Sequence, residues 1–94
     1  MPVQIRFEFT SPPQSVRLFQ EGRELALIET PGTEVVRTIP LVWVHEGVDL
    51  RVQVGWRESR NLSAARVTVT DANGAEYQRS IWGAGPTDEV LTFP

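Results

Sequence analysis

Tryptophan and arginine are the residue types in this chain whose side chains could form a contact site. The chain has three tryptophans, Trp43, Trp56 and Trp82, and tryptophan is a residue that anchors interfaces and stacks on sugar rings. All nine basic residues are arginines, so any cationic contact uses a planar, fork-shaped guanidinium group. The question that follows is which of the tryptophans faces solvent.

Two of the tryptophans occur in apolar segments. Trp56 keeps the phase of the alternating run 48–54, in which every second residue is apolar, and this pattern predicts that its side chain faces the core. Trp43 lies in the apolar run 41–44, where the phase is ambiguous. Neither is therefore the first choice for a contact with another molecule.

Trp82 is the candidate for a surface contact. It stands out of phase with Tyr77, Arg79 and Ile81, and it directly precedes a loop rich in glycine. A guanidinium group from Arg79 or Arg57 could lie nearby and complete the site. The predicted binding residues are therefore Trp82, Arg79 and Arg57.

Catalytic chemistry has little support in the sequence. The only histidine, His45, lies in a predicted turn beside Glu46, and one imidazole cannot build a multi-histidine zinc site. No serine occupies the Gly-x-Ser-x-Gly pattern of a nucleophile elbow. We expect His45 to be a solvated turn residue, and we expect no catalytic residue and no enzyme activity.

Two loops resemble ligand-binding loops only in part. Asp71, Asn73 and Gly74 match the opening of a calcium loop, but the later oxygen ligands are missing, so a hairpin turn is favoured over a weak ion site formed with Glu76. The loop 83–86 lacks the lysine and the following helix of a phosphate loop, and its glycines are expected to let the chain cross between sheets. We expect no metal ion and no cofactor.

Composition and charge exclude several classes of protein. The net charge is −3 without a basic run, which argues against nucleic-acid binding, and the chain has no cysteine, which excludes disulfides and thiolate metal sites. The N-terminal residues alternate without an apolar signal region, and no apolar stretch approaches the roughly 20 residues that cross a bilayer. Membrane insertion is not expected, and the sequence does not indicate a cellular compartment.

The elements that must position these side chains are β-strands. Apolar and polar residues alternate with a period of two over most of the chain, and no segment has the apolar stripe of a helix. The runs 16–19 and 25–28 flank a turn with Gly22 and predict a hairpin, and Asp71–Gly74 gives the strongest hairpin signal. Pro40 interrupts the run Val35–Val44, which predicts an edge strand or a bulge.

Seven or eight strands joined by short turns predict an all-β fold. With 94 residues the chain forms one domain over residues 1–94. Alternating strands give each sheet one dry face, so two antiparallel sheets packed as a sandwich are favoured over a small barrel.

The stretch Ala65–Glu76 resembles the last hairpin of bacterial immunoglobulin-like and fibronectin type III-like modules, which carry a Val-x-Val-x-Asp-x-Asn-Gly pattern. The resemblance implies an immunoglobulin-like sandwich, in which Trp43 or Trp56 would be the buried central tryptophan. It also implies a spacer, an interaction surface or a sugar-binding unit. One more predicted strand, Val90–Phe93, departs from the pattern, as does the missing cysteine pair.

Three hypotheses for function remain open. The first is a non-catalytic interaction or structural module that binds a protein partner or itself through a sheet face or an edge strand. The alternative is a module that binds a small ligand, a carbohydrate, with Trp82 as the platform. The third is an enzyme, or an accessory subunit of an enzyme, whose site lies at a subunit boundary.

Overall fold

The computed structural model describes residues 3–43, 47–56 and 62–94, and its regular elements are all β-strands. There are eight of them: β1 (Val3–Phe9), β2 (Ser15–Gln20), β3 (Arg23–Glu29), β4 (Glu34–Ile39), β5 (Val48–Val54), β6 (Ser63–Thr70), β7 (Glu76–Gly83) and β8 (Thr87–Phe93). The described residues include no helix that could cross a membrane. The predicted all-β fold is confirmed.

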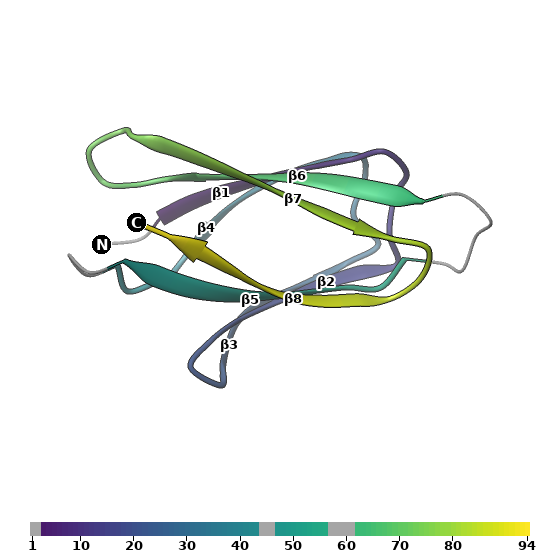
Figure 1. The fold of residues 1–94 in the computed structure, drawn as a ribbon, viewed down its shortest axis with the longest axis horizontal. Helices are drawn as coiled ribbons and strands as arrows, with labels where there is room; N and C mark the ends of the chain where they lie inside the picture. Colours follow the sequence, from purple (N-terminus) through teal and green to yellow (C-terminus); the bar gives the residue numbers. More distant parts are fainter. Residues whose placement is uncertain (1–2, 44–46, 57–61) are drawn as a thin grey trace.

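The strands form two four-stranded sheets that pack face to face (Figure 1). Sheet A has the order β4-β1-β6-β7, and sheet B has the order β3-β2-β5-β8. Every pair of neighbouring strands is antiparallel. The predicted two-sheet antiparallel sandwich is therefore confirmed.

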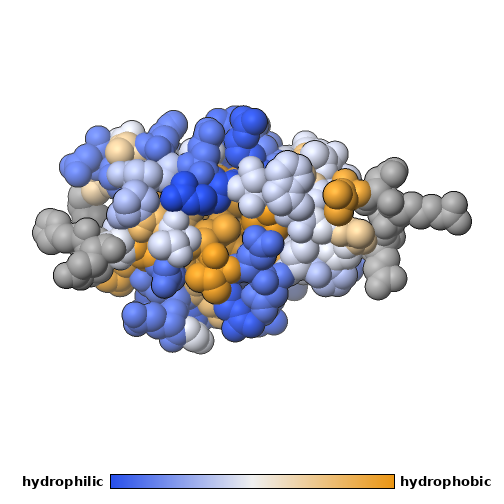
Figure 2. Space-filling view, in the orientation of Figure 1, coloured by the Kyte–Doolittle hydropathy of each residue, from blue (hydrophilic) through white to orange (hydrophobic). Residues whose placement is uncertain are grey.

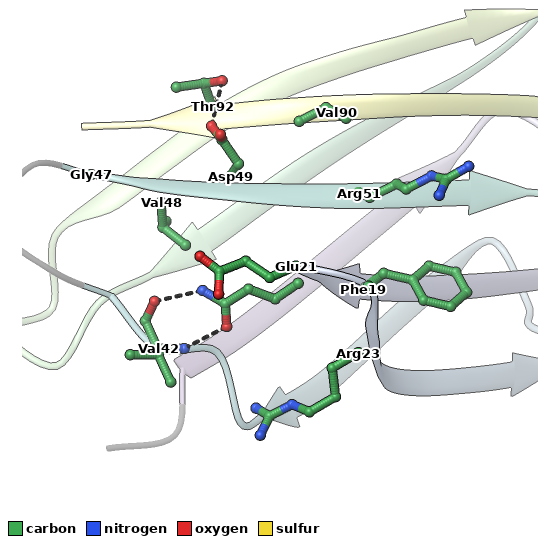
Figure 3. A pocket seen from close by; sticks show the side chains of 12 residues that line it. Phe19, Glu21, Arg23, Val42, Gly47, Val48, Asp49, Arg51, Val90 and Thr92 are labelled. Atoms are coloured by element: carbon green, nitrogen blue, oxygen red, sulfur yellow. Dashed lines mark hydrogen bonds between the residues drawn. The ribbon is translucent and has the colours of Figure 1, made fainter.

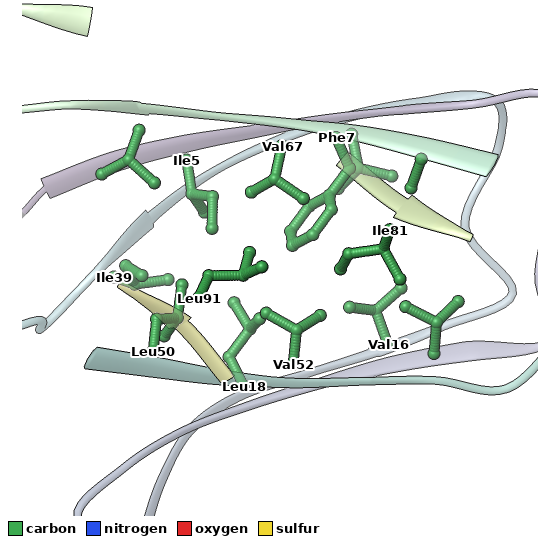
Figure 4. Close-up of a cluster of buried hydrophobic side chains, with 14 of the residues drawn as sticks. Ile5, Phe7, Val16, Leu18, Ile39, Leu50, Val52, Val67, Ile81 and Leu91 are labelled. Atoms are coloured by element: carbon green, nitrogen blue, oxygen red, sulfur yellow. The ribbon is translucent and has the colours of Figure 1, made fainter. Parts of the chain in front are cut away.

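The core lies between the two sheets and is built from the apolar phase of each strand (Figure 4). In β1 the buried side chains are Val3, Ile5, Phe7 and Phe9, none more than 6% exposed, and they alternate with polar residues that face outward. Burying an apolar side chain of this size contributes about 1.5–3 kcal/mol. The period of two thus determines which side of each strand joins the core.

The hairpin between β2 and β3 turns in two residues. Glu21 and Gly22 have φ angles of 49° and 79°, the combination of a type I′ turn, whose twist matches that of the strands. Glycine adopts this conformation without strain, whereas Glu21 has a side chain that disfavours it. The hairpin predicted around Gly22 is confirmed.

The hairpin between β6 and β7 closes through a longer turn, and the prediction of a hairpin there is also confirmed. The Asp71 amide donates to the Ala75 carbonyl at 2.9 Å, and Gly74 takes a positive φ of 86°. The Asp71 carboxylate accepts hydrogen bonds from the amides of Asn73 and Ala75 at 2.8 and 2.9 Å. The aspartate therefore holds the turn together through its own backbone neighbours.

Pro40 ends strand β4, which corrects the predicted extent of the Val35–Val44 strand. β4 is the outermost strand of sheet A, so the predicted edge position is confirmed, but the strand stops at Ile39 because proline has no N–H to donate to a ladder. The chain then leaves the sheet, and the side chain of Gln20 holds it through two hydrogen bonds to the backbone of Val42, at 2.7 and 2.9 Å.

The connection from β7 to β8 crosses from sheet A to sheet B, as the glycines of the loop predict. β8 begins at Thr87 and not at Val90, so the last strand is longer than predicted. Its three added residues pair with the far end of β5, where Thr87 lies opposite Val54. The final strand therefore runs along the whole of β5.

Two tryptophans flank strand β5 in the chain: Trp43 comes before it, and Trp56 comes after it. Trp56 is 3% exposed and packs edge-to-face against Phe9, with ring centroids 6.4 Å apart, which confirms its predicted place in the core. Trp43 is half-buried, packs on Phe93 at 5.9 Å and donates its indole N–H to the carbonyl of Pro94 at 2.7 Å.

Candidate functional site

Trp82 lies on the outer face of sheet A. It pairs with Ala64 of β6, and 62% of its surface is exposed. Its neighbour Ile81 points the other way and is fully buried. The indole therefore presents its ring to solvent, as its phase predicts, and is free to contact another molecule.

Arg79 belongs to the opposite face of β7, so the structure does not bring it together with Trp82. Its Nε donates to the carbonyl of Thr92 at 3.1 Å, and its guanidinium carbon lies 5.0 Å from the centre of the Phe93 ring. These contacts join β7 to β8 across the gap between the sheets. Figure 2 shows this side of the molecule, where hydrophobic residues lie along the middle between hydrophilic ones.

Other candidates fall outside the described residues or are already engaged. Arg57 and His45 both lie outside the described part of the chain. The carboxylate of Asp71 is occupied by the amides of its own turn. Over residues 3–43, 47–56 and 62–94, no three acidic or histidine side chains gather as metal ligands would.

The outer face of sheet B carries a row of side chains that the sequence analysis did not identify. Phe19 of β2 lies opposite Arg51 of β5, and Arg51 lies opposite Val90 of β8. In the next row Arg17 of β2 lies opposite Leu27 of β3. These five residues, Arg17, Phe19, Leu27, Arg51 and Val90, form what we call the sheet B surface.

Phe19 is half-buried between two arginines. The guanidinium carbons of Arg17 and Arg51 lie 5.4 and 5.9 Å from the centre of its ring, within the range of a cation–π contact. Each arginine is also oriented by a carboxylate. Arg17 donates through two nitrogens to Glu24, at 3.1 and 3.3 Å, and Arg51 donates through two nitrogens to Asp88.

The ion pair between Arg51 and Asp88 changes the pKa values of both side chains. The hydrogen bond from Arg51 lowers the pKa of the Asp88 carboxyl, with a smaller contribution in the same direction from the amide of Gln53. The same pair raises the pKa of Arg51. The surface therefore keeps both charges fixed at neutral pH, and its arginines are held in one orientation.

A hollow of about 720 Å³ adjoins this surface (Figure 3). Phe19, Arg51 and Val90 line one side of it, and the β2–β3 turn and Val42 line the other. Arg23 helps to shape the hollow because its Nη2 donates to the carbonyl of Pro40 at 3.1 Å. The volume lies within the range of small-ligand sites, and the lining mixes apolar and charged groups.

The outer face of sheet A has a different character. Its two large exposed apolar residues, Val36 and Trp82, are on the two opposite edge strands, β4 and β7. The positions between them on β1 and β6 carry polar side chains such as Arg6 and Thr68. The apolar residues of sheet A are thus isolated, whereas those of sheet B lie in adjacent rows.

One signal in the sequence could have found the sheet B surface. Phe19, Leu27 and Val90 are apolar residues that occupy the solvent-facing phase of their strands. The phase alone shows that each side chain points outward. It does not show that β8 belongs to the same sheet as the predicted hairpin of β2 and β3, so the proximity of Val90 to Phe19 required the strand order.

Comparisons with known proteins give no relative for this chain. No family model, no curated protein and no solved structure matches it.

Proposed function

We propose that this chain is a non-catalytic interaction module and that the sheet B surface is its contact site. The observation that carries the proposal is the row Phe19, Arg51 and Val90, which presents aromatic, cationic and aliphatic side chains across three neighbouring strands. The partner is another protein or a second copy of the chain.

The chemistry of the surface supports protein binding. Aromatic residues and arginine are enriched among the residues that dominate binding energy at interfaces. Ion pairs with Glu24 and Asp88 hold the arginines Arg17 and Arg51 in place, so less side-chain freedom is lost when a partner binds. Val90 and Leu27 are 59% and 50% exposed and would gain from being covered.

We also propose a relation in architecture to immunoglobulin-like and fibronectin type III-like modules. The hairpin at Asp71–Gly74 and the paired sheets support it. The connection order differs, because β1 and β2 lie in different sheets, whereas the first two strands of constant-type antibody domains lie side by side. The relation therefore supports a spacer or contact role, and no specific ligand.

A pair of matched variants tests the contact site. Val90→Glu places a charge on the sheet B surface, and Val36→Glu places the same charge on the outer face of sheet A, where Val36 is 40% exposed. With the chain as bait, proteins captured from a cell extract should be lost with V90E and retained with V36E. Equal capture by both variants, with unchanged melting temperatures, would contradict the proposal.

Carbohydrate binding is the second candidate, and the exposure of Trp82 favours it. A glycan array should then show binding that Trp82→Ala abolishes without a change in melting temperature, because the side chain lies outside the core. Trp43 is the control, since Trp43→Phe removes its hydrogen bond to the Pro94 carbonyl and leaves Trp82 in place. Absence of any glycan that depends on Trp82 would rule this candidate out.

A further inference from the structure

Arginine side chains lie along the edges of both sheets. The edge strands are β4 and β7 in sheet A, and β3 and β8 in sheet B. Three of them carry an arginine in their inward phase: Arg37 on β4, Arg79 on β7 and Arg23 on β3. An inward-pointing charge on an edge strand disfavours addition of a further strand, because the added strand would bury it. These guanidinium groups also donate hydrogen bonds, and their acceptors are backbone carbonyls at the edges of the sheets.

Arg37 covers a free carbonyl of its own strand. The amide of Phe9 donates to the carbonyl of Thr33 at 2.8 Å, and in an antiparallel ladder only every second residue bonds to the neighbouring strand. The carbonyl of Val36 therefore points away from β1, toward the free side of β4. The Nη1 of Arg37 donates to this carbonyl at 2.9 Å. The guanidinium group thus occupies the place that an N–H of an added strand would take.

Arg79 covers carbonyls of two edge strands at once. The amide of Asp71 donates to the carbonyl of Ala75 at 2.9 Å, so by the same alternation the carbonyl of Gln78 points away from β6. The Nη1 of Arg79 donates to the Gln78 carbonyl at 2.7 Å. Its Nε donates to the carbonyl of Thr92 in β8, the edge of the other sheet, at 3.1 Å. One guanidinium group therefore occupies acceptors on both β7 and β8.

Arg23 makes a similar link between β3 and the end of β4. It lies opposite Gln20 of β2, and its Nη2 donates to the carbonyl of Pro40, directly after β4, at 3.1 Å. This bond joins an edge strand of sheet B to the chain that leaves sheet A, as Arg79 joins β7 to β8. Guanidinium suits these links because its N–H donors form a fixed planar fork and can serve more than one carbonyl.

We propose that these arginines close the edges of the sandwich to strand addition, so that a partner binds a face of the module and not an edge. The second half of this inference rests on the proposed function. It separates the two modes of binding considered from the sequence, a sheet face and an edge strand. Strand β8 has a further guard in Glu89, which lies in the inward phase opposite Val52.

Strand β4 shows what its arginine prevents. If β4 of a second copy paired antiparallel with Val36 opposite Val36, the free N–H and C=O groups of the two valines would bond to each other. Arg37 of each copy would then lie beside Val35 of the other, and its bond to the Val36 carbonyl would be lost. Arg37→Val removes both obstacles. It also makes the run 35–39 entirely β-branched, a composition that favours strands.

Arg37→Val is therefore the variant that tests edge closure. It is made in the V90E background, so that association through the sheet B surface does not contribute. In sedimentation equilibrium, the dissociation constant for self-association of R37V/V90E should be at least about tenfold below that of V90E. Arg66→Val is the matched control, because Arg66 is an exposed arginine on β6, which has a strand neighbour on each side. R66V/V90E should associate no more than V90E does.

The outcomes separate edge closure from the proposed contact site. In the associated R37V/V90E chain, the amides of Val36 and Thr38 should gain protection from hydrogen exchange, measured by NMR. If R37V/V90E stays monomeric at about 1 mM, or R66V/V90E associates equally, edge closure is overturned. Arg37→Thr gives the same test if circular dichroism shows that the valine variant is unfolded. The proposed contact site fails on a different result, extract capture that V90E does not reduce.

Discussion

At the scale of residues, Phe19 shows how an exposed aromatic is held in place. Its ring lies between the guanidinium groups of Arg17 and Arg51, and each of these arginines is bound to a carboxylate. An aromatic ring flanked by oriented cations is a rigid feature on an otherwise solvated face. Rigid surface groups lose less freedom on binding, which is why we assign the contact to this side of the molecule.

The ion pair between Arg51 and Asp88 predicts a dependence of stability on pH. The pKa of Asp88 is lower in the folded chain, so the pair stabilises the fold above the unfolded pKa of about 3.9, and this contribution is lost as the pH falls through the folded value. The difference in unfolding free energy between the original chain and Asp88→Asn should therefore be present at pH 6 and shrink toward pH 2.

Urea denaturation at several pH values measures this difference. Arg51→Gln provides the control, because it removes the hydrogen bond that is the largest cause of the shift. The effect of D88N in the R51Q background should be nearly independent of pH. A difference that stays constant from pH 6 to pH 2 in the original background would show that the pair does not form.

The β2–β3 turn predicts two opposite effects on stability. Glu21 has a positive φ of 49°, so Glu21→Asn should stabilise the chain by about 0.5–1 kcal/mol, because asparagine tolerates this conformation better. Gly22→Ala should destabilise it by about 1 kcal/mol. Space is not the cause, since no atom lies within 4 Å of an added Cβ at Gly22. Thermal unfolding measures both, and destabilisation by E21N would contradict the type I′ turn.

At the scale of elements, Arg79 joins the edges of the two sheets. Arg79→Ala should cost about 1–2 kcal/mol, because it removes the hydrogen bond to the Thr92 carbonyl and uncovers the Phe93 ring. Arg37 is the matched control, since it is also an inward-facing arginine on an edge strand, but within the described residues its side chain donates only to the carbonyl of its neighbour Val36. Arg37→Ala should cost less than about 0.5 kcal/mol. Equal costs in urea denaturation would contradict the bridging role.

The sequence predicts the strands well because burial follows the period of two. β1 and β5 alternate without exception, and both appear with the expected faces buried. The sequence does not predict where Pro40 leaves the sheet, because an apolar run continues past it to Leu41, which is buried outside any strand. A run of apolar residues predicts which residues are buried. It does not predict which of them are hydrogen-bonded to a neighbouring strand.

At the scale of the whole molecule, the candidate site depends on strand order. Phase predicts correctly that Trp82 faces outward, but it does not predict that Arg79 faces the other sheet and bridges to β8. It also does not predict that Phe19 and Val90 share a row, since they are distant in sequence and meet only through Arg51 of β5. Contacts between strands far apart in the chain are the part that sequence reasoning lacks.

The three tryptophans differ in how much of each side chain is exposed to solvent. Trp82 is 62% exposed, Trp43 is half-buried and Trp56 is 3% exposed. Iodide should therefore quench mainly the fluorescence of Trp82. Trp82→Phe should remove most of the quenchable fraction, whereas Trp56→Phe should leave it nearly unchanged. If the loss follows Trp56→Phe, the arrangement of the two sheets is wrong.

Hydrogen exchange of the backbone amides tests the central claim that sheet B is the contact side. Exchange is measured by mass spectrometry for the chain at low concentration, at high concentration, and in complex with a captured partner. The account predicts added protection in sheet B, over residues 15–29, 48–54 and 87–93, when either complex forms. Added protection confined to β1, β4, β6 and β7 would place the contact on sheet A and contradict it.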